Sequence, residues 1–237
     1  MKLLIAADKT RFHNLKQFAD ELVKYGIEYK LIDDSDIYDA PNILHKYSRW
    51  FKTPKKFQKI ITEFKPDAIF TERYSRFSLL VIKHNIPLWI YMGGDHWTEI
   101  KQFYAKTKIS TFRKIELWYK NKISEKCFRE SEIIFVDDEY MKKIVKNRFP
   151  NKKIGLMFQG IKESEWIENE KMVLKHPCVG LLQRANVWGK TEEMLILPKI
   201  IEAFPEVTFY WAGDGQYRNE ILAKLKKYKN FEWLGAL

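Results

Sequence analysis

Two fixed positive charges flank a turn in the C-terminal part of the chain. Arg184 follows the apolar run 177–182, and Lys190 stands six residues later, directly after Gly189. A helix is predicted to begin at about Thr191, and the free N–H groups of a helix N-terminus attract anions. Arg can hold a phosphate through two parallel hydrogen bonds, while Lys adds a point charge. The pair predicts a diphosphate site, although two solvated loop cations would have the same spacing.

A glycine turn, Gly213-Asp214-Gly215, lies between another predicted strand and helix. Glycines permit a tight turn and a close approach of the backbone to a ligand. The third glycine of a dinucleotide-binding fingerprint is missing, because Arg218 and Asn219 occupy the place where it would be sought. Taken alone, the turn is more typical of an ordinary strand–helix connection than of a nucleotide-binding loop.

A third polar cluster follows the predicted strand 87–91, where Gly93 and Gly94 precede Asp95 and His96. A histidine at the end of a strand could contact a sugar hydroxyl or a phosphate, or transfer a proton. His96 is therefore a candidate catalytic residue, with Asp95 as the second candidate. A loop histidine can equally be structural or merely exposed.

Short apolar runs alternate with longer amphipathic segments along the whole chain. Unbroken apolar strands between helices predict an α/β fold with parallel sheets covered on both faces. The segment 33–53 has no regular pattern. Strands are predicted at 2–7, 27–32, 67–71, 87–91, 132–136, 153–158, 177–182, 207–212 and 231–234, and helices at 14–25, 54–64, 77–84, 111–129, 139–147, 191–204 and 216–228.

Ligands of such sheets bind outside the carboxyl ends of the strands. His13 and Glu72 follow two of the predicted strands, so they join Gly93 and Gly94 as candidate acceptor-side loop residues. The polar segment Lys162–Lys175 separates two alternating series of strands and helices. It predicts two domains, 1–165 and 166–237.

The composition limits the class of protein. The formal net charge is +11, which favours polyanions, anionic surfaces or phosphorylated small molecules as partners. Cys127 and Cys178 lie far apart and form no metal-ligand pattern, so we expect no metal site and a reducing, cytoplasmic environment. No apolar run approaches the roughly 18 residues of a membrane span.

Much of the positive charge lies in one segment. Residues 101–129 carry nine Lys or Arg and two Glu, a net charge of +7, with aromatic residues interleaved. A basic helix with aromatic residues suits an anionic surface at the inner face of a membrane, and Lys114, Trp118, Lys120 and Lys122 are the candidate contacts. A solvated basic face over a core-facing helix is the alternative. No nucleic-acid-binding motif is present, so we expect no nucleic acid partner.

The order of these motifs resembles the family-4 glycosyltransferases of GT-B fold. The segment 179–184 with Gly189-Lys190 is similar to the family's Gly-Arg-Leu…Lys-Gly motif, with the arginine displaced but its spacing of six to the lysine kept. The segment 211–215 resembles the family's Gly-x-Gly turn. Phe158-Gln-Gly-Ile161 stands where the family has its Asn-Gly-Val/Ile segment between domains.

The resemblance implies two Rossmann-like domains, the first on the acceptor side and the second binding a nucleotide sugar. It implies that Arg184 and Lys190 bind the donor diphosphate, that 213–215 form a donor loop and that His96 contacts the donor sugar. Family members generally retain the anomeric configuration and use no metal ion, with the nucleotide sugar as substrate rather than cofactor. A glycan or a lipid-linked molecule would be the acceptor.

Two features depart from the family pattern. The first loop reads Asp8-Lys-Thr-Arg-Phe-His13, whereas the family's loop is commonly glycine-rich. The family's Glu-x7-Glu segment, which holds the donor ribose and sugar, is absent from the 237 residues. We therefore expect the second domain to be incomplete through C-terminal truncation. The alternative function is a non-catalytic module that binds a nucleotide, a glycan or a membrane.

Overall fold

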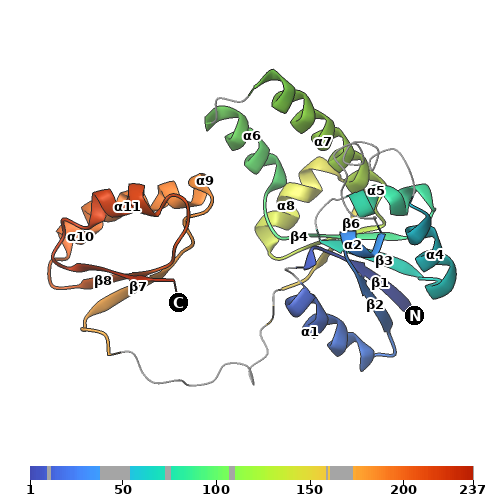
Figure 1. Cartoon of the computed structure of the whole chain (residues 1–237), viewed down its shortest axis with the longest axis horizontal. Helices are drawn as coiled ribbons and strands as arrows, with labels where there is room; N and C mark the ends of the chain where they lie inside the picture. The colour runs from blue at the N-terminus through green and yellow to red at the C-terminus, as the bar shows by residue number, and fades with distance from the viewer. Residues whose placement is uncertain are drawn as a thin grey trace. The chain divides into compact units, whose positions relative to one another are not determined.

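The structure is a computed structural model that describes residues 1–9, 12–37, 54–72, 76–106, 110–158, 160 and 173–236. The chain divides into two compact units, Met1–Glu163 and Ser164–Leu237, here called the first and the second domain (Figure 1). The predicted boundary at 165/166 falls outside the described residues.

The first domain is built on one parallel sheet of six strands in the order β2-β1-β3-β4-β5-β6 (Figure 1). The chain leaves β1 toward β2 and then crosses to β3 on the other side, so the switch point of the sheet lies between β1 and β3. The strands are β1 Lys2–Ala6, β2 Glu28–Ile32, β3 Ala68–Glu72, β4 Leu88–Met92, β5 Ile133–Val136 and β6 Lys153–Leu156. The helices are α1 Phe12–Val23, α2 Asp34–Ile37, α4 Lys55–Phe64, α5 Arg76–Lys83, α6 His96–Lys106, α7 Thr111–Glu130 and α8 Glu139–Arg148.

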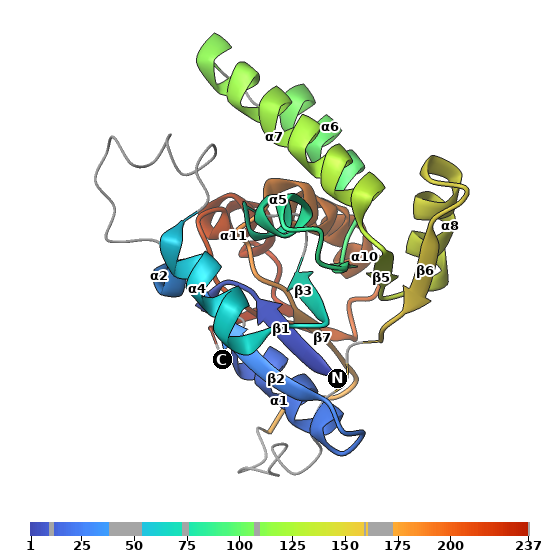
Figure 2. The same cartoon turned by 90° about the vertical axis from the view of Figure 1, so that its right-hand side faces the viewer.

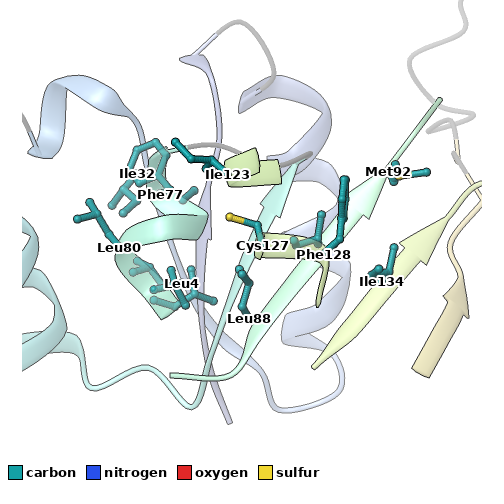
Figure 3. Packing of buried hydrophobic residues seen from close by; sticks show 14 of the residues in the cluster. Leu4, Ile32, Phe77, Leu80, Leu88, Met92, Ile123, Cys127, Phe128 and Ile134 are labelled. Atoms are coloured by element: carbon teal, nitrogen blue, oxygen red, sulfur yellow. The ribbon is translucent and has the colours of Figure 1, made fainter. Parts of the chain in front are cut away.

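Both faces of this sheet bury apolar side chains, because successive strand residues point to opposite faces. Leu4 and its neighbours face a large cluster formed with α2 and α4 to α8. Leu3 and its neighbours face a smaller cluster formed with α1. Figure 3 shows Cys127 and Phe128 of α7 packed near Leu88 in the larger cluster. The prediction of an α/β fold with parallel sheets is confirmed.

The second domain has a smaller parallel sheet in the order β7-β8-β9. Trp211 of β8 is fully buried at the centre of its apolar cluster. The strands are β7 Cys178–Leu182, β8 Thr208–Ala212 and β9 Phe231–Gly235, and the helical segments are α9 Trp188–Thr191, the 3-10 helix η3 Glu192–Ile196, α10 Leu197–Ala203 and α11 Arg218–Leu225.

The predicted helix 191–204 is wrong in its continuity, because the structure divides this region into α9, η3 and α10. Pro198 lies at the start of α10. A proline inside a continuous α-helix lacks its N–H and collides with the carbonyl four residues earlier, so the helix has to restart near it. The helix predicted at 54–64 begins one residue later, at Lys55, so Pro54 is the N-cap residue of α4 and not part of its first turn.

Two more helices were not predicted. Residues 34–37 form the short α2 inside the segment expected to be irregular, and α6 begins at His96, where a loop was expected. Figure 2 shows α6 and α7 side by side, with the N-terminal half of α7 extending beyond the sheet of the first domain. None of the helices in the described ranges combines the length and apolar character needed to cross a bilayer.

Candidate functional site

The loops after β7 and β8 are tied to each other at the carboxyl edge of the second sheet. The Ala185 N–H donates to the Asp214 carbonyl at 3.0 Å, and the Tyr217 N–H donates to the Ala185 carbonyl at 3.0 Å. The Gln216 side chain donates to the Asn186 carbonyl at 2.8 Å. These bonds fix the positions of both loops, so the side chains that they carry are held at the edge of the sheet.

Gly213 and Gly215 make this contact between the loops possible. A Cβ atom on Gly213 would lie 1.9 Å from the Gln183 carbonyl oxygen, and one on Gly215 would lie 2.4 Å from the Ala185 carbonyl carbon. Real Cβ atoms do not approach backbone atoms this closely, so only glycine fits without a shift of the neighbouring loop. The close backbone approach at these glycines is therefore with the chain itself.

Arg184 and Lys190 extend from this fixed edge. Both residues are exposed. Among the described residues, no carboxylate lies within ion-pair distance of either cation. Their charge is therefore not neutralised by the part of the chain that the structure describes, which leaves both able to bind an external anion.

The position of Lys190 differs from the prediction. It lies inside α9 rather than in front of a helix that begins at Thr191. Because α9 has four residues, the dipole of a long helix cannot supply the expected attraction for an anion. The case for anion binding at this edge rests on the two cations.

A third cation at the same edge was missed by sequence reasoning. The Arg218 guanidinium lies 3.2 Å from both carboxylate oxygens of Asp214, and its centre lies 5.2 Å from the centroid of the Trp233 ring. The Trp233 indole N–H donates to the Gly213 carbonyl at 2.8 Å. The spacing of four between Asp214 and Arg218 on a helix start could have indicated this ion pair.

Two aromatic rings also meet at this edge. The Trp188 and Tyr217 rings lie 5.2 Å apart between centroids, in an edge-to-face arrangement. Both residues are half-buried, and Trp188 precedes Gly189-Lys190. Sequence reasoning missed the pair because its members follow two different strands, 29 positions apart in the sequence.

In the first domain, Asp95 caps α6. Its carboxylate accepts hydrogen bonds from the Trp97 N–H at 3.1 Å and from the Thr98 N–H at 3.0 Å, and from the Thr98 hydroxyl. This is the bonding of a helix N-cap. A general acid or base would have to give up some of these bonds during the reaction.

His96 is in the first turn of the same helix and is 9% exposed. Its Nε2 shares a hydrogen bond of 2.9 Å with the Ser124 hydroxyl. The ring packs against Trp97 and Phe128, with centroid distances of 6.0 and 5.8 Å. These contacts join the start of α6 to α7. The structure thus gives both Asp95 and His96 structural roles, and their catalytic assignment stays a prediction.

The acceptor-side candidates lie at the carboxyl edge of the first sheet. His13 is exposed in the first turn of α1, Glu72 ends β3, and Gly93 and Gly94 follow β4. A fifth residue was missed, since Asp137 follows β5 and its Oδ1 is buried without a hydrogen-bond partner among the described residues. An acid directly after a predicted strand was the available signal.

The candidate membrane contacts on α7 differ in their surroundings. Trp118 is 58% exposed, and Lys114 and Lys122 are exposed beside it. Lys120 is half-buried and forms an ion pair of 2.6 Å with Glu116. The structure therefore groups Lys114, Trp118 and Lys122 as exposed surface and separates Lys120 from them. Nowhere in the described ranges do three or more His, Cys, Asp or Glu side chains gather in a group that could hold a metal ion.

Comparison with known proteins identifies the fold. A scan against models of protein families finds no match, and no curated protein matches the sequence. Solved structures match the whole chain. They include the UDP complex of S. aureus MnaA (10% identity, TM-score 0.57, 69% of that chain covered) and UDP-GlcNAc 2-epimerase from Neisseria meningitidis bound to UDP-GlcNAc (14% identity, TM-score 0.56, 72% covered).

A UDP-glucosyltransferase from Polygonum tinctorium also matches the whole chain, with 12% identity, a TM-score of 0.50 and 71% of that chain covered. At these identities the likeness concerns the fold alone. The chain has the fold of GT-B glycosyltransferases and UDP-GlcNAc 2-epimerases, with two Rossmann-like domains.

Proposed function

We propose that the chain binds a nucleotide sugar through its diphosphate at Arg184 and Lys190, and that it acts as a glycosyltransferase of family-4 type. The observation that carries the proposal is the pair of exposed cations, Arg184 on the loop after β7 and Lys190 in α9, with no described carboxylate in ion-pair distance. Hydrogen bonds to the loop after β8 hold the loop that carries Arg184. A diphosphate would supply the missing negative charge.

Two structures of the same fold contain uridine nucleotides, UDP in S. aureus MnaA and UDP-GlcNAc in the N. meningitidis epimerase. This supports a UDP-sugar as the first donor to test. Trp188 lies in the same segment after β7 as the two cations and packs on Tyr217 from the loop after β8, and this pair gives the base or ribose an apolar surface to contact.

Transfer of the sugar breaks the bond between its anomeric carbon and the diphosphate, so negative charge grows on the departing nucleotide. Arg184 and Lys190 would stabilise that charge, which is the role that a metal ion fills in other transferases. Retention of the anomeric configuration and independence of metal ions are part of the proposal through the family resemblance. The acceptor is a glycan or a lipid-linked molecule, bound on the side of the first domain.

Epimerisation is the second candidate, because UDP-GlcNAc 2-epimerases share the fold. An epimerase changes the sugar and keeps it attached to UDP, whereas a transferase releases UDP. The order and spacing of Arg184, Lys190 and the Gly213–Gly215 turn favour the transferase. A non-catalytic module would bind the nucleotide and do neither.

Calorimetric titration with UDP and UDP-sugars tests the binding step. Arg184→Ala and Lys190→Ala should each weaken binding by about 1.5–3 kcal/mol, the value of a hydrogen bond to a charged group. Lys224→Ala is the matched control, because it removes an exposed cation from the last turn of α11 in the same domain. Equal affinities in wild type and all three variants would refute the site.

Product analysis of the same UDP-sugars separates the reactions. Released UDP that requires an added glycan or lipid acceptor supports transfer. Conversion of the sugar while it stays attached to UDP would show an epimerase and refute the transferase.

A further inference from the structure

The surface of α7 changes character along its length. Ile115, Trp118 and Tyr119 in the N-terminal half are 60%, 58% and 37% exposed. In the C-terminal half, Cys127 and Phe128 are fully buried in the core of the first domain (Figure 3). The C-terminal half therefore anchors the helix, and the N-terminal half extends from the first domain (Figure 2). The large apolar side chains of this N-terminal half are exposed.

Six of the exposed residues of α7 form one stripe, and Lys114 and Glu130 are exposed at its two edges. At about 100° per residue of an α-helix, the members of the stripe lie within an arc of about 100°. In chain order the stripe consists of Ile115, Trp118, Tyr119, Lys122, Lys126 and Arg129. The first three residues have large apolar or aromatic side chains, and the last three are cations. Apolar residues thus occupy the solvent side of one half of α7 and the core side of the other, so the two halves present different surfaces to solvent.

The cations of the stripe remain mostly uncompensated. No described carboxylate lies within 4.0 Å of Lys122 or Arg129. Lys126 lies 3.8 Å from Glu130, and the Lys122 ammonium lies 5.8 Å from the centroid of the Trp118 ring. The helix as a whole carries six Lys or Arg and three Glu.

A groove of about 420 Å³ runs between these cations and α8. Lys122, Lys126, Arg129 and Arg148 line it together with Asn121, Glu125 and Glu130. Arg148 is paired with Glu125 at 2.6 Å, which holds it at the wall of the groove. The four cations outnumber the two glutamates of the lining, so the groove keeps a net positive charge behind the apolar end of the stripe.

We propose that this stripe docks the first domain on an anionic lipid bilayer. The apolar end, Ile115, Trp118 and Tyr119, enters the interface between headgroups and acyl chains. The cationic end, Lys122, Lys126 and Arg129, binds lipid phosphates at the height of the headgroups. Large apolar side chains next to cations that are mostly uncompensated match a surface that is apolar inside and negative outside. The inference is independent of the proposed nucleotide site, which lies in the other domain.

Flotation with lipid vesicles tests the proposal on the whole chain. The protein should float with equimolar phosphatidylglycerol and phosphatidylcholine and stay behind with phosphatidylcholine alone. Added salt up to about 1 M should weaken the binding without abolishing it, because salt screens the cations but not the apolar contacts. The triple variant Lys122→Glu, Lys126→Glu, Arg129→Glu should lower the partition coefficient by about 100-fold or more.

Two matched controls distinguish the stripe from bulk charge and bulk apolarity. Lys55→Glu, Lys56→Glu, Lys59→Glu changes the net charge equally on exposed positions of α4 and should keep most of the binding. Ile115→Ser with Trp118→Ser should remove the salt-resistant part, whereas Val23→Ser with Tyr25→Ser, also exposed, should not. Circular dichroism establishes that each variant is folded.

Three results would overturn the proposal. The first is a wild-type chain that does not float with anionic vesicles at low salt. The second is an equal loss in the α4 control. The third is self-association that Trp118→Ser abolishes while vesicles remain unbound, since it would assign the apolar end to a second copy of the chain.

Discussion

Polar residues stand at the carboxyl edge of a parallel sheet in both domains, but their bonding differs. In the first domain, the Asp95 carboxylate is occupied by the start of α6, and the His96 ring is buried beside Ser124. In the second domain, Arg184 and Lys190 are exposed, with no carboxylate in ion-pair distance in the described parts of the chain. The position of a polar residue after a strand therefore does not by itself identify a ligand site. A ligand site also needs side chains whose charges and hydrogen-bonding groups are not already satisfied by the folded chain.

The largest difference between the domains should be in the reactivity of their cysteine thiols. Cys127 is fully buried, and burial raises the pKa of its thiol to about 12, so only about one molecule in 10⁴ is a thiolate at pH 8. Cys178 is half-buried beside His176. Alkylation of folded protein should modify Cys127 at least about 10³-fold more slowly than Cys178. The variant Cys178→Ser allows the alkylation rate of Cys127 to be measured alone. Similar alkylation rates for the two cysteines in the folded protein would contradict the burial of Cys127 in the core of the first domain.

Gly213→Ala should be the most destabilising of the point changes. The new Cβ would displace the loop that carries Arg184, because its site is 1.9 Å from the Gln183 carbonyl oxygen. Overpacking of this kind costs about 3 kcal/mol. Gly180→Ala is the control, since its Cβ would meet nothing within 4 Å. Denaturant unfolding followed by tryptophan fluorescence measures both, and equal stabilities would show that the two loops are not locked together.

His96→Ala should lower the stability of the first domain by about 2–3 kcal/mol, because a buried ring and its packing on Trp97 and Phe128 are lost. His13→Ala, at an exposed position of α1, should change stability by less than about 0.5 kcal/mol. Thermal unfolding provides the comparison. If His96→Ala keeps the wild-type melting temperature but loses turnover, this result would support a catalytic role for His96 and contradict the structural role.

The Asp33 carboxyl should make a smaller, pH-dependent contribution to the free energy of unfolding. Hydrogen bonds from Ser35 lower the pKa of this buried carboxyl despite its desolvation. A folded-state pKa below the unfolded value stabilises the protein above about pH 4 and loses that effect as the pH falls through the folded pKa. Ser35→Ala should therefore cost about 1 kcal/mol at neutral pH and less in strong acid, where the protonated carboxyl is a weaker acceptor. A loss that is independent of pH would refute this origin.

Much of the fold could be predicted because its signals are local. Apolar runs bounded by polar residues place the strands within about two residues, and their alternation with helices predicts the parallel sheets. Some errors also had local signals that were not used. Asp95 followed by Thr98 and Glu99 is typical of the start of a helix. Pro198 predicts an interruption of the helical segment just before α10.

The candidate site was less predictable because it depends on contacts across the sequence. The hydrogen bond between the Trp211 indole and the Gln183 carbonyl joins residues 28 positions apart, and nothing in the sequence around either residue indicates it. For the same reason, sequence could not show that Gly213 and Gly215 accommodate a neighbouring loop, or that His96 is covered by α7. Residue type indicated the available chemistry, whereas burial and pairing had to come from the structure.

Hydrogen exchange of the whole chain with and without UDP measures most directly which domain edge holds the nucleotide. We expect slower amide exchange in 183–190 and 213–218 at saturating UDP, and no change in 93–98. The slowing should disappear in the double variant Arg184→Ala, Lys190→Ala. Protection confined to 93–98, or protection that persists in the double variant, would contradict a nucleotide site built on these two cations.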